Sequence, residues 1–177
     1  TRIRQVSTGV LAFMVMDGWS ASGWADTRPI EADSRSSFVL VRNLLGKAHE
    51  DCLSIMHSYV SIDLNAFIIY GKGSGTGIVA NGSVQGVRIL NGTVRGLATG
   101  ISLSGYGNVV ENGRIAHNTD TGLFLGASST ARQLVVQKNF QMGVVLYAAC
   151  SISDSMIRAN RNSTSRIGLP AGPGSTV

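Results

Sequence analysis

Charged residues are scarce in this chain. Asp, Glu, Lys and Arg make up 14% of its 177 residues, against about a quarter in an average soluble domain. Proline occurs only 3 times, and aromatic residues reach only 6%. Because the 22 glycines accompany many serines, asparagines and β-branched residues, this composition predicts one domain of tightly turned β-structure and disfavours helical bundles and disorder.

Two further absences narrow the class of protein. The net charge is +5, but the sequence has no run of Lys or Arg and no basic residues interleaved with aromatic ones, so nucleic-acid binding is disfavoured. No apolar stretch approaches the roughly 20 residues that a helix needs to span a membrane. The positive charge that is present would favour an anionic partner.

A short phrase, in which glycine precedes two apolar residues separated by one variable position, recurs along the chain. It begins at Gly77, Gly100, Gly122 and Gly143, with an incomplete Gly-Leu at Gly168, so the intervals are 23, 22, 21 and 25 residues. A nearly constant period of this length, built from short β-like runs, is typical of a solenoid. The stretch from residue 77 to residue 168 therefore predicts stacked coils.

The two cysteines can be placed by the same alignment. Cys52-Leu53-Ser54-Ile55 repeats the phrase with cysteine in place of glycine, which gives five full coils opening at residues 52, 77, 100, 122 and 143. Cys150 lies four coils later, and coils stacked about 4.8 Å apart would separate the two cysteines by about 19 Å. A disulfide bridges at most roughly 7 Å between Cα atoms, so we predict two free, mostly buried thiols.

Alignment of the coils predicts which side chains face the core. In each coil the first and third residues after the opening position point inward and the second points outward, because side chains alternate along a strand. A second register, with a strict offset of 21 residues, aligns another apolar column and a column of asparagines that can hydrogen-bond along the axis. The inward columns are Leu53, Ile78, Ile101, Leu123, Val144 and Ile55, Ala80, Leu103, Leu125, Leu146; the outward column is Ser54, Val79, Ser102, Phe124, Val145; the second register holds Val94, Ile115, Val136, Ile157 and Asn118, Asn139, Asn160.

Asn91-Gly92 and Asn112-Gly113 lie at the same offset and mark a corner of the coil. Asparagine-glycine pairs also form β-hairpin turns, which would give an antiparallel sandwich. Hairpins do not explain a pattern that returns once per coil with three apolar columns, whereas parallel winding does. We therefore predict an all-β fold, a right-handed parallel β-helix of five to six coils of 21–25 residues that spans residues 26–169.

Residues 1–25 do not share the repeat. Arg2 and Arg4 precede an apolar run from Val10 to Met16, and small polar residues and then Gly23-Trp24-Ala25 follow, in the order of a secretory signal peptide. Such a signal would make the protein secreted, periplasmic or attached to the cell surface. The run is short, however, and the alternative is a cap over the first coil.

The other end, residues 170–177, is rich in proline and glycine and predicts a flexible tail. A solenoid end without a cap exposes core residues and strand edges. We therefore expect either a longer β-helix or a homo-oligomer that covers this end.

Three stretches carry a resemblance to a known family. They are Ser61-Ile62-Asp63-Leu64-Asn65-Ala66-Phe67-Ile68-Ile69, then Gly73-Ser74-Gly75-Thr76-Gly77-Ile78, then Asn91-Gly92-Thr93-Val94-Arg95-Gly96 followed by Gly100-Ile101. Over residues 36–169 this text resembles the right-handed parallel β-helix proteins of the pectin-lyase-like superfamily. The resemblance implies the fold, but that superfamily includes lyases, hydrolases, esterases, epimerases, phage tailspikes and exported repeat proteins, so it selects no activity.

The carboxylates of the repeat region do not predict a catalytic site. A glycoside hydrolase needs two carboxylates about 5–9 Å apart, whereas Asp63 and Asp154 lie about four coils apart and Asp120 lies in a turn. Glu111 aligns with Arg132 one coil later, which predicts an ion pair between coils. The aspartate-pair, Gly-His-Gly and Asp-Pro-His-Glu motifs of the superfamily's enzymes are absent, as is an acidic cluster for Ca²⁺. We predict no catalytic residue, no metal and no cofactor.

Histidines also give no metal site. His49-Glu50-Asp51-Cys52 is the densest group of ligand-forming residues, but consecutive residues alternate between two faces, so at most two could converge on one ion. We interpret this segment as a polar turn before the first coil. His117 aligns with Lys138 in an outward column and is expected to face solvent.

The outward positions of the first strand offer a candidate binding surface. Phe124, Val145 and Tyr147 fall there on adjacent coils, and such a strip can stack on sugar rings or pack against another subunit or a terminal segment of the chain. Basic residues gather in the same C-terminal third. The predicted ligand-binding residues are Phe124, Val145, Tyr147, Arg132, Lys138 and Arg158.

These observations support one leading hypothesis, a non-catalytic exported module that binds a surface or acidic polysaccharide. A polysaccharide lyase or glycoside hydrolase with an unfamiliar site is the first alternative. A trimeric, tailspike-like adhesin that associates through the Phe124 face is the second.

Overall fold

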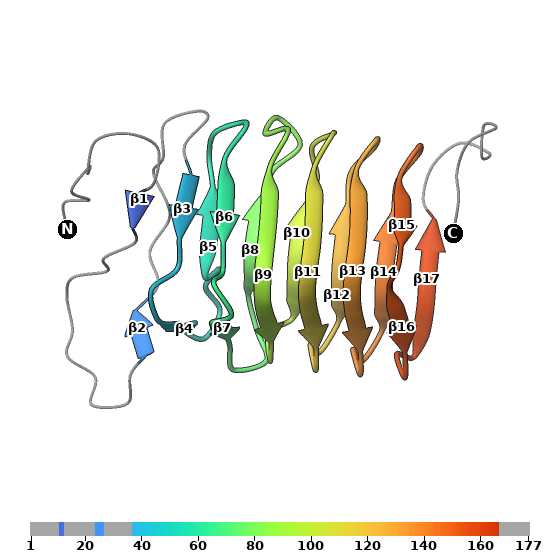
Figure 1. Cartoon of the computed structure of the whole chain (residues 1–177). Helices are drawn as coiled ribbons and strands as arrows, with labels where there is room; N and C mark the ends of the chain where they lie inside the picture. The colour runs from blue at the N-terminus through green and yellow to red at the C-terminus, as the bar shows by residue number, and fades with distance from the viewer. Residues whose placement is uncertain (1–10, 13–23, 27–36, 167–177) are drawn as a thin grey trace.

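The computed structural model describes residues 11–12, 24–26 and 37–166, and the account of the fold is limited to them. These residues form a parallel β-solenoid of about six turns and contain no helix. Figure 1 shows the strands side by side along one axis, from the N-terminal to the C-terminal end of the chain. The predicted all-β parallel solenoid is therefore confirmed.

One wall of the solenoid, here called sheet B, has six strands that follow one another in chain order. Five of them are the predicted phrases, and each pairs in parallel with the strand one coil away. The strands are β5 (Leu53–Ile55), β8 (Thr76–Ala80), β10 (Thr99–Leu103), β12 (Thr121–Leu125), β14 (Met142–Leu146) and β17 (Asn162–Arg166).

The rest of each coil belongs to sheet A, which has eleven strands. In the middle coils one eight-residue strand runs the whole length of this wall, whereas nearer the ends of the solenoid the same path is divided in two. The strands are β1 (Leu11–Ala12), β2 (Trp24–Asp26), β3 (Ser37–Val39), β4 (Asn43–Leu45), β6 (Ser61–Asp63), β7 (Ile68–Tyr70), β9 (Arg88–Arg95), β11 (Val109–Ala116), β13 (Thr130–Gln137), β15 (Ser151–Ser153) and β16 (Met156–Arg158).

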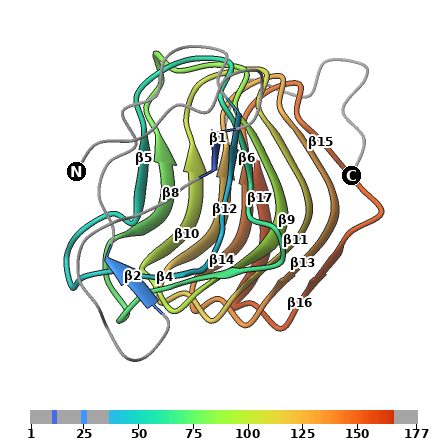
Figure 2. The ribbon, with the colours of Figure 1, turned by 60° about the vertical axis from the view of Figure 1, so that its left-hand side comes forward.

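Sheet A bends within its long strands. Asn91, Asn112 and Gln133, one per coil, have φ of 57°, 52° and 54°, in the left-handed region that asparagine tolerates better than most residues. The bend turns the wall, as the view in Figure 2 makes visible. The corner predicted from the Asn-Gly pairs is confirmed, although the third coil uses Gln133 for the same turn.

The core lies between the two walls and follows the predicted columns. Ile101 is in register with Ile78 and with Leu123, and these three side chains are at most 2% exposed. Ile115 is in register with Val94 and Val136, as the 21-residue offset predicts. Each coil thus buries apolar side chains above and below those of its neighbours, which is the main source of stability in a solenoid.

The predicted asparagine ladder is also present. The Nδ2 of Asn118 donates to the Oδ1 of Asn139 over 2.9 Å, and the Nδ2 of Asn139 donates to the Oδ1 of Asn160 over the same distance. Asn118 and Asn139 are buried. The ladder lies at the corner where the chain leaves sheet A for sheet B, and it fixes the offset of successive coils there.

One detail of the predicted register is wrong. The sixth strand of sheet B pairs Val144 with Thr164, so the position equivalent to Gly143 is Ser163 and not Gly168. The ladder holds the 21-residue offset as far as Asn160. The chain therefore reaches the edge of sheet B at Asn162, before Gly168 can be used.

The N-terminal segment contributes two short strands to sheet A. Leu11–Ala12 pairs in parallel with Phe38 and Val39, and Trp24–Asp26 pairs with Asn43–Leu45. The rest of residues 1–25, and the tail of residues 170–177, lie outside the described residues. Whether residues 1–25 act as a signal peptide or as a cap stays a prediction.

Both cysteines are free and buried, as predicted. Cys52 opens the first coil, and its backbone N–H donates to the carbonyl of Thr76 over 2.8 Å. Its sulfur lies so close to Gly46 that a Cβ at that glycine would come within 2.4 Å. A glycine at position 46 is therefore what makes room for the thiol in the core.

Candidate functional site

The predicted aromatic strip, hereafter the sheet-B strip, consists of Phe124, Val145 and Tyr147. The rings of Phe124 and Tyr147 meet edge to face, with centroids 5.4 Å apart and an interplanar angle of 63°. Val145 is in register with Phe124 on the adjacent strand. The three residues therefore form one apolar patch on the outer face of sheet B.

The members of the sheet-B strip differ in how much surface they offer. Tyr147 is 40% exposed and Phe124 is half-buried, whereas Val145 is only 6% exposed. Val145 points outward as predicted, but it can give almost no contact area to a ligand. The two rings carry the binding capacity of the strip.

Tyr147 follows β14 at the position that Gly126 holds one coil earlier. The N–H of Tyr147 donates to the carbonyl of Leu125 over 3.0 Å, and the N–H of Gly126 makes the equivalent bond to Leu103 over 2.8 Å. Gly126 thus occupies the position below Tyr147 without presenting a side chain. Gly126 is required by the coil before it, because a Cβ there would lie 2.1 Å from the carbonyl oxygen of Gly105.

A second feature, hereafter the corner hollow, lies where the chain passes from sheet A to sheet B. It is a shallow, open depression of about 420 Å³ lined by Lys138, Asn139, Phe140, Ala159 and Arg161. Lys138 and Ala159 have φ of 54° and 53°, so two successive coils turn here in the same left-handed conformation. The Asn139 amide, held in the ladder, forms the floor.

An aromatic ring and a guanidinium dominate the corner hollow. Phe140 is 64% exposed, and the guanidinium carbon of Arg161 lies 5.8 Å from the centre of its ring. This distance is within the range of cation–π attraction. Lys138 adds a second exposed cation, so the hollow combines a flat apolar surface with positive charge.

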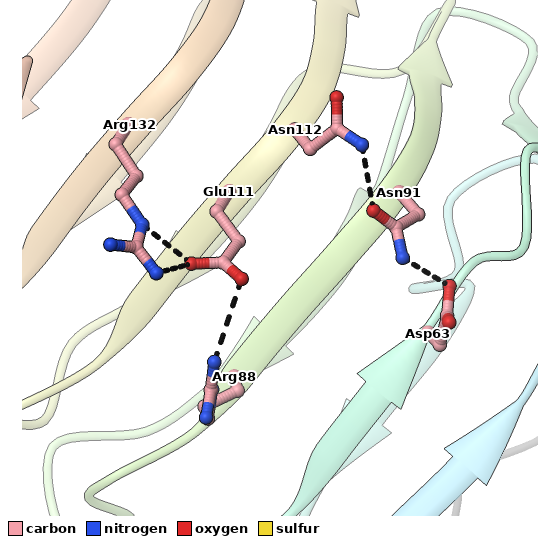
Figure 3. Close-up of polar contacts among 6 residues, drawn as sticks. All are labelled: Asp63, Arg88, Asn91, Glu111, Asn112 and Arg132. Atoms are coloured by element: carbon pink, nitrogen blue, oxygen red, sulfur yellow. Dashed lines mark hydrogen bonds and ion pairs between the residues drawn. The ribbon is translucent and has the colours of Figure 1, made fainter. Parts of the chain in front are cut away.

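Arg132 is on a different face from these two features. Its Nε donates to the Oε2 of Glu111 over 2.7 Å, and Arg88 reaches the other carboxylate oxygen over 3.5 Å. Figure 3 shows these residues as a row across three coils of sheet A. The predicted Glu111–Arg132 ion pair is confirmed, and it assigns Arg132 to this row and not to a site with Phe124.

Arg158 lies between these groups. It ends β16 on the sheet-A side of the corner, and its Nε donates to the Oε1 of Gln137 over 3.1 Å. Arg158 is therefore close in sequence to Ala159 and the corner hollow but engaged by its neighbour. Of the six predicted binding residues, three form the strip, Lys138 lines the hollow, and Arg132 and Arg158 belong to sheet A.

Two of the four carboxylates considered as catalytic groups have clear structural partners. The Oδ1 of Asp63 accepts hydrogen bonds from the N–H of Asn65 over 2.7 Å and from the Nδ2 of Asn91 over 3.0 Å. Asn112 extends this chain by donating to Asn91 over 2.8 Å, as Figure 3 shows. Glu111 lies between two arginines. Both carboxylates connect neighbouring coils.

The segment from His49 to Cys52 also has structural contacts. The Oδ1 of Asp51 accepts a hydrogen bond from the N–H of Thr76 over 2.7 Å, and the N–H of His49 donates to the Oγ of Ser74 over 2.8 Å. Burial, and then the nearby charge of Asp51, raise the pKa of the Cys52 thiol to about 12. Within the described part of the chain no three His, Cys, Asp or Glu residues are grouped as they would be around a metal ion.

Two groups of residues were missed in the sequence. Phe140 is not among the predicted binding residues, although it follows the ladder residue Asn139 and lies 21 residues before Arg161 in the same alignment. The other group lies at the opposite end of sheet A. There the Oδ1 of buried Asn108 accepts a hydrogen bond from the N–H of Val87 over 3.0 Å, and the Oγ of Ser129 accepts one from the N–H of Asn108 over the same distance. Because this column contains four different residue types, Val87, Asn108, Ser129 and Cys150, it does not stand out as a repeat.

Compared with known proteins, the chain matches no family model, no curated protein and no solved structure. The proposed function therefore depends on the solenoid and its surface groups. Among the described residues there is also no helix of the length and apolarity needed to cross a membrane.

Proposed function

We propose that the chain is an exported, non-catalytic binding module of the pectin-lyase-like superfamily and that its ligand is a linear acidic polysaccharide. The observation that carries the proposal is the pairing of exposed rings with cations along one side of the solenoid. Phe124 and Tyr147 offer apolar surface on sheet B, and Phe140 with Arg161 offers a charged aromatic surface at its edge.

The two features lie at opposite ends of the same strand. Phe140 precedes β14 and Tyr147 follows it, and a strand rises about 3.3 Å per residue, so the two are roughly 23 Å apart along the strand direction. An extended oligosaccharide of several units, lying along β14, would reach from the corner hollow to the sheet-B strip. A flat, extended surface of this kind suits a polymer better than a small molecule, which prefers an enclosed pocket.

The charges of the corner hollow favour an acidic ligand. Lys138 and Arg161 line it, and no carboxylate appears among its described lining residues. A uronate or sulfate group placed there would meet one or two cations in a charge-assisted hydrogen bond. The pyranose ring attached to that group could stack on Phe140, as sugar rings do on aromatic side chains.

A binding role is also favoured over catalysis by the state of the carboxylates. Asp63 and Glu111 are engaged by asparagine and arginine side chains of neighbouring coils, which is the environment of a structural residue. The first alternative, a lyase or hydrolase, requires a polysaccharide to be cleaved. The second, a trimeric adhesin, would bury the Phe124 face between subunits.

The proposal is tested by affinity electrophoresis or pull-down of the purified chain with a polyuronate, a sulfated polysaccharide and a neutral glucan. We expect retention by the acidic polymers that falls as salt rises. Phe124→Ala and Tyr147→Ala should lower retention, whereas Tyr106→Ala, which removes a 58% exposed ring from a turn beyond sheet B, should not. Arg161→Gln should weaken binding more than Arg114→Gln, an equal loss of charge on sheet A.

Three outcomes would contradict the proposal. Equal effects of the site variants and their matched controls would mean that net charge alone causes binding. Release of reducing ends or unsaturated products from any polymer would establish the enzyme alternative. A threefold mass in light scattering that Phe124→Asp abolishes would establish the adhesin alternative.

A further inference from the structure

Three asparagine-glycine pairs occur in the chain, at Asn81-Gly82, Asn91-Gly92 and Asn112-Gly113. Such pairs are prone to a reaction within the backbone, because glycine has no side chain to hinder its own nitrogen. The glycine nitrogen attacks Cγ of the asparagine and forms a new C–N bond, its proton passes to water, and the side-chain amide leaves as ammonia. Water then opens the cyclic imide to aspartate or isoaspartate, so the reaction needs no other reagent.

The fold holds two of the three pairs in place. The Nδ2 of Asn91 donates to Asp63, and its Oδ1 accepts from the Nδ2 of Asn112. Gly92 and Gly113 pair with each other in the parallel ladder of β9 and β11. For either asparagine to cyclise, its amide would have to leave this hydrogen-bonded chain and its glycine would have to leave the ladder.

Gly92 is fixed by packing as well as by pairing. A Cβ added there would lie 2.3 Å from the Cβ of Leu64, so the backbone at this corner rests directly on a buried side chain. The rotation that brings a glycine nitrogen to the neighbouring Cγ is therefore opposed by the core itself. Folding should slow the reaction strongly at this corner.

The third pair lies outside the ladder, in the turn that follows β8. Asn81, Gly82 and Ser83 are all exposed, and the turn is closed by a hydrogen bond from the N–H of Val84 to the carbonyl of Asn81 over 3.1 Å. A Cβ at Gly82 would meet nothing within 4 Å. The space beside the Cα of Gly82 is thus open, in contrast to the close packing of Gly92 on Leu64.

The side chain of Asn81 is also polarised in the direction that the reaction needs. Its Oδ1 accepts a hydrogen bond from the N–H of Ser83 over 3.0 Å and another from the Oγ of Ser83 over 2.6 Å. When the nitrogen of Gly82 adds to Cγ, negative charge develops on this oxygen. Two donors already directed at it stabilise that charge, as the donors of an oxyanion hole do.

We infer that Asn81 is a site of spontaneous deamidation in the folded protein and that Asn91 and Asn112 are protected from it. The product carries a carboxylate where β8 ends. In its isoaspartate form it also lengthens the backbone by one methylene group. The inference rests on the fold alone and does not depend on the proposed ligand.

The test follows all three pairs in one sample. The full chain is incubated at mildly alkaline pH, both folded and in urea, and peptide mapping by mass spectrometry measures conversion at each asparagine, with enzymatic methylation of isoaspartate as a second readout. In the folded protein we expect conversion at Asn81 only. In urea we expect all three pairs to convert at comparable rates.

Two variants separate the causes. Gly82→Ala should nearly abolish conversion and should fold normally, since its Cβ meets no neighbour and its φ is not in the left-handed region. Ser83→Ala should slow conversion several-fold in the folded state but leave the rate in urea little changed. The inference is overturned if folded Asn81 stays intact, if Asn91 or Asn112 converts as fast, or if Ser83→Ala has no effect.

Discussion

Asn118 donates two hydrogen bonds to a single atom, the Oδ1 of Asn139, one from its backbone N–H over 3.1 Å and one from its Nδ2 over 2.9 Å. Asn139 makes the same pair of bonds to Asn160, over 2.9 Å each. The backbone groups at this corner cannot all be satisfied by sheet pairing, because the chain turns there. The side-chain ladder supplies the missing acceptors inside the core.

Asn139→Ala should therefore lower the free energy of unfolding by about 1–3 kcal/mol, because it leaves buried donors of Asn118 without an acceptor. Asn112→Gly is the matched control, since it removes an exposed amide with one bond to Asn91, glycine tolerates the left-handed φ of this position, and the change should cost less than about 1 kcal/mol. Urea denaturation of both variants measures the difference. Equal effects would show that the buried ladder has no special role.

A substitution in an apolar column should lower the free energy of unfolding more than a substitution in the asparagine ladder. Ile115 is 1% exposed and stacks between Val94 and Val136, so Ile115→Ala should lower the free energy of unfolding by about 2–5 kcal/mol through lost burial and a cavity. Arg114→Ala, at the adjacent exposed position, should change it by less than about 0.5 kcal/mol. A neutral result at Ile115 in the same denaturation assay would contradict the register of sheet A.

The sequence predicted the fold well because the repeat reports it many times over. Every coil has the same pattern of inward and outward positions, and the 21-residue offset aligns Val94 with Ile115 and Asn118 with Asn139. The predicted coil opening at Gly168 is wrong. Its Gly-Leu pair matches the repeat phrase, but the register of the last coil is already set by the bond between Asn139 and Asn160. A two-residue match to the repeat is therefore weaker evidence for the position of a coil than the asparagine ladder before it.

The surface was harder to predict, for a physical reason. Alternation along a strand gives the direction of a side chain but not its exposure, so Val145 was correctly placed outward and yet is almost fully buried. Closeness along the chain also does not place two charges on one face: Arg132 lies on sheet A, whereas Lys138 lines the corner hollow. Phe140 lies in the corner between sheet A and sheet B, where strand alternation does not apply.

The contact between Phe124 and Tyr147 should be measurable in the absence of any ligand. Edge-to-face aromatic pairs contribute about 0.5–1.5 kcal/mol beyond the burial of their surface. In a double-mutant cycle with Phe124→Leu and Tyr147→Leu, we expect a coupling free energy of unfolding in this range. A coupling near zero would indicate that the two rings do not form a joint surface.

Replacing Glu111 should have a small effect on the free energy of unfolding, and this effect should depend on salt concentration. Its carboxylate lies between the guanidinium groups of Arg88 and Arg132, about half of whose surface is exposed, and exposed ion pairs contribute about 0–1 kcal/mol. Glu111→Gln should therefore cost less than about 1 kcal/mol at low ionic strength. Raising the salt concentration should shrink the difference from wild type in urea denaturation, and a difference that is independent of salt would contradict the electrostatic explanation.

The Cys52 thiol makes stability depend on alkaline pH. Burial first, and then the charge of Asp51, raise its pKa to about 12 in the folded state, from the ordinary value of 9.0. Between these values the unfolded chain releases the thiol proton while the folded chain keeps it, so the free energy of unfolding falls as pH rises. The stabilisation is fully present below the unfolded pKa and is lost by about 1.4 kcal/mol per pH unit above it.

Cys52→Ala isolates this contribution, because other groups also titrate in alkali but do so in both proteins. The variant should lose some stability at every pH through the smaller side chain. Between about pH 9 and about pH 11, however, wild type should lose more stability than the variant, so the difference between them narrows as pH rises. Urea denaturation over this range measures it, and a constant difference would mean that the thiol is not held protonated in the core.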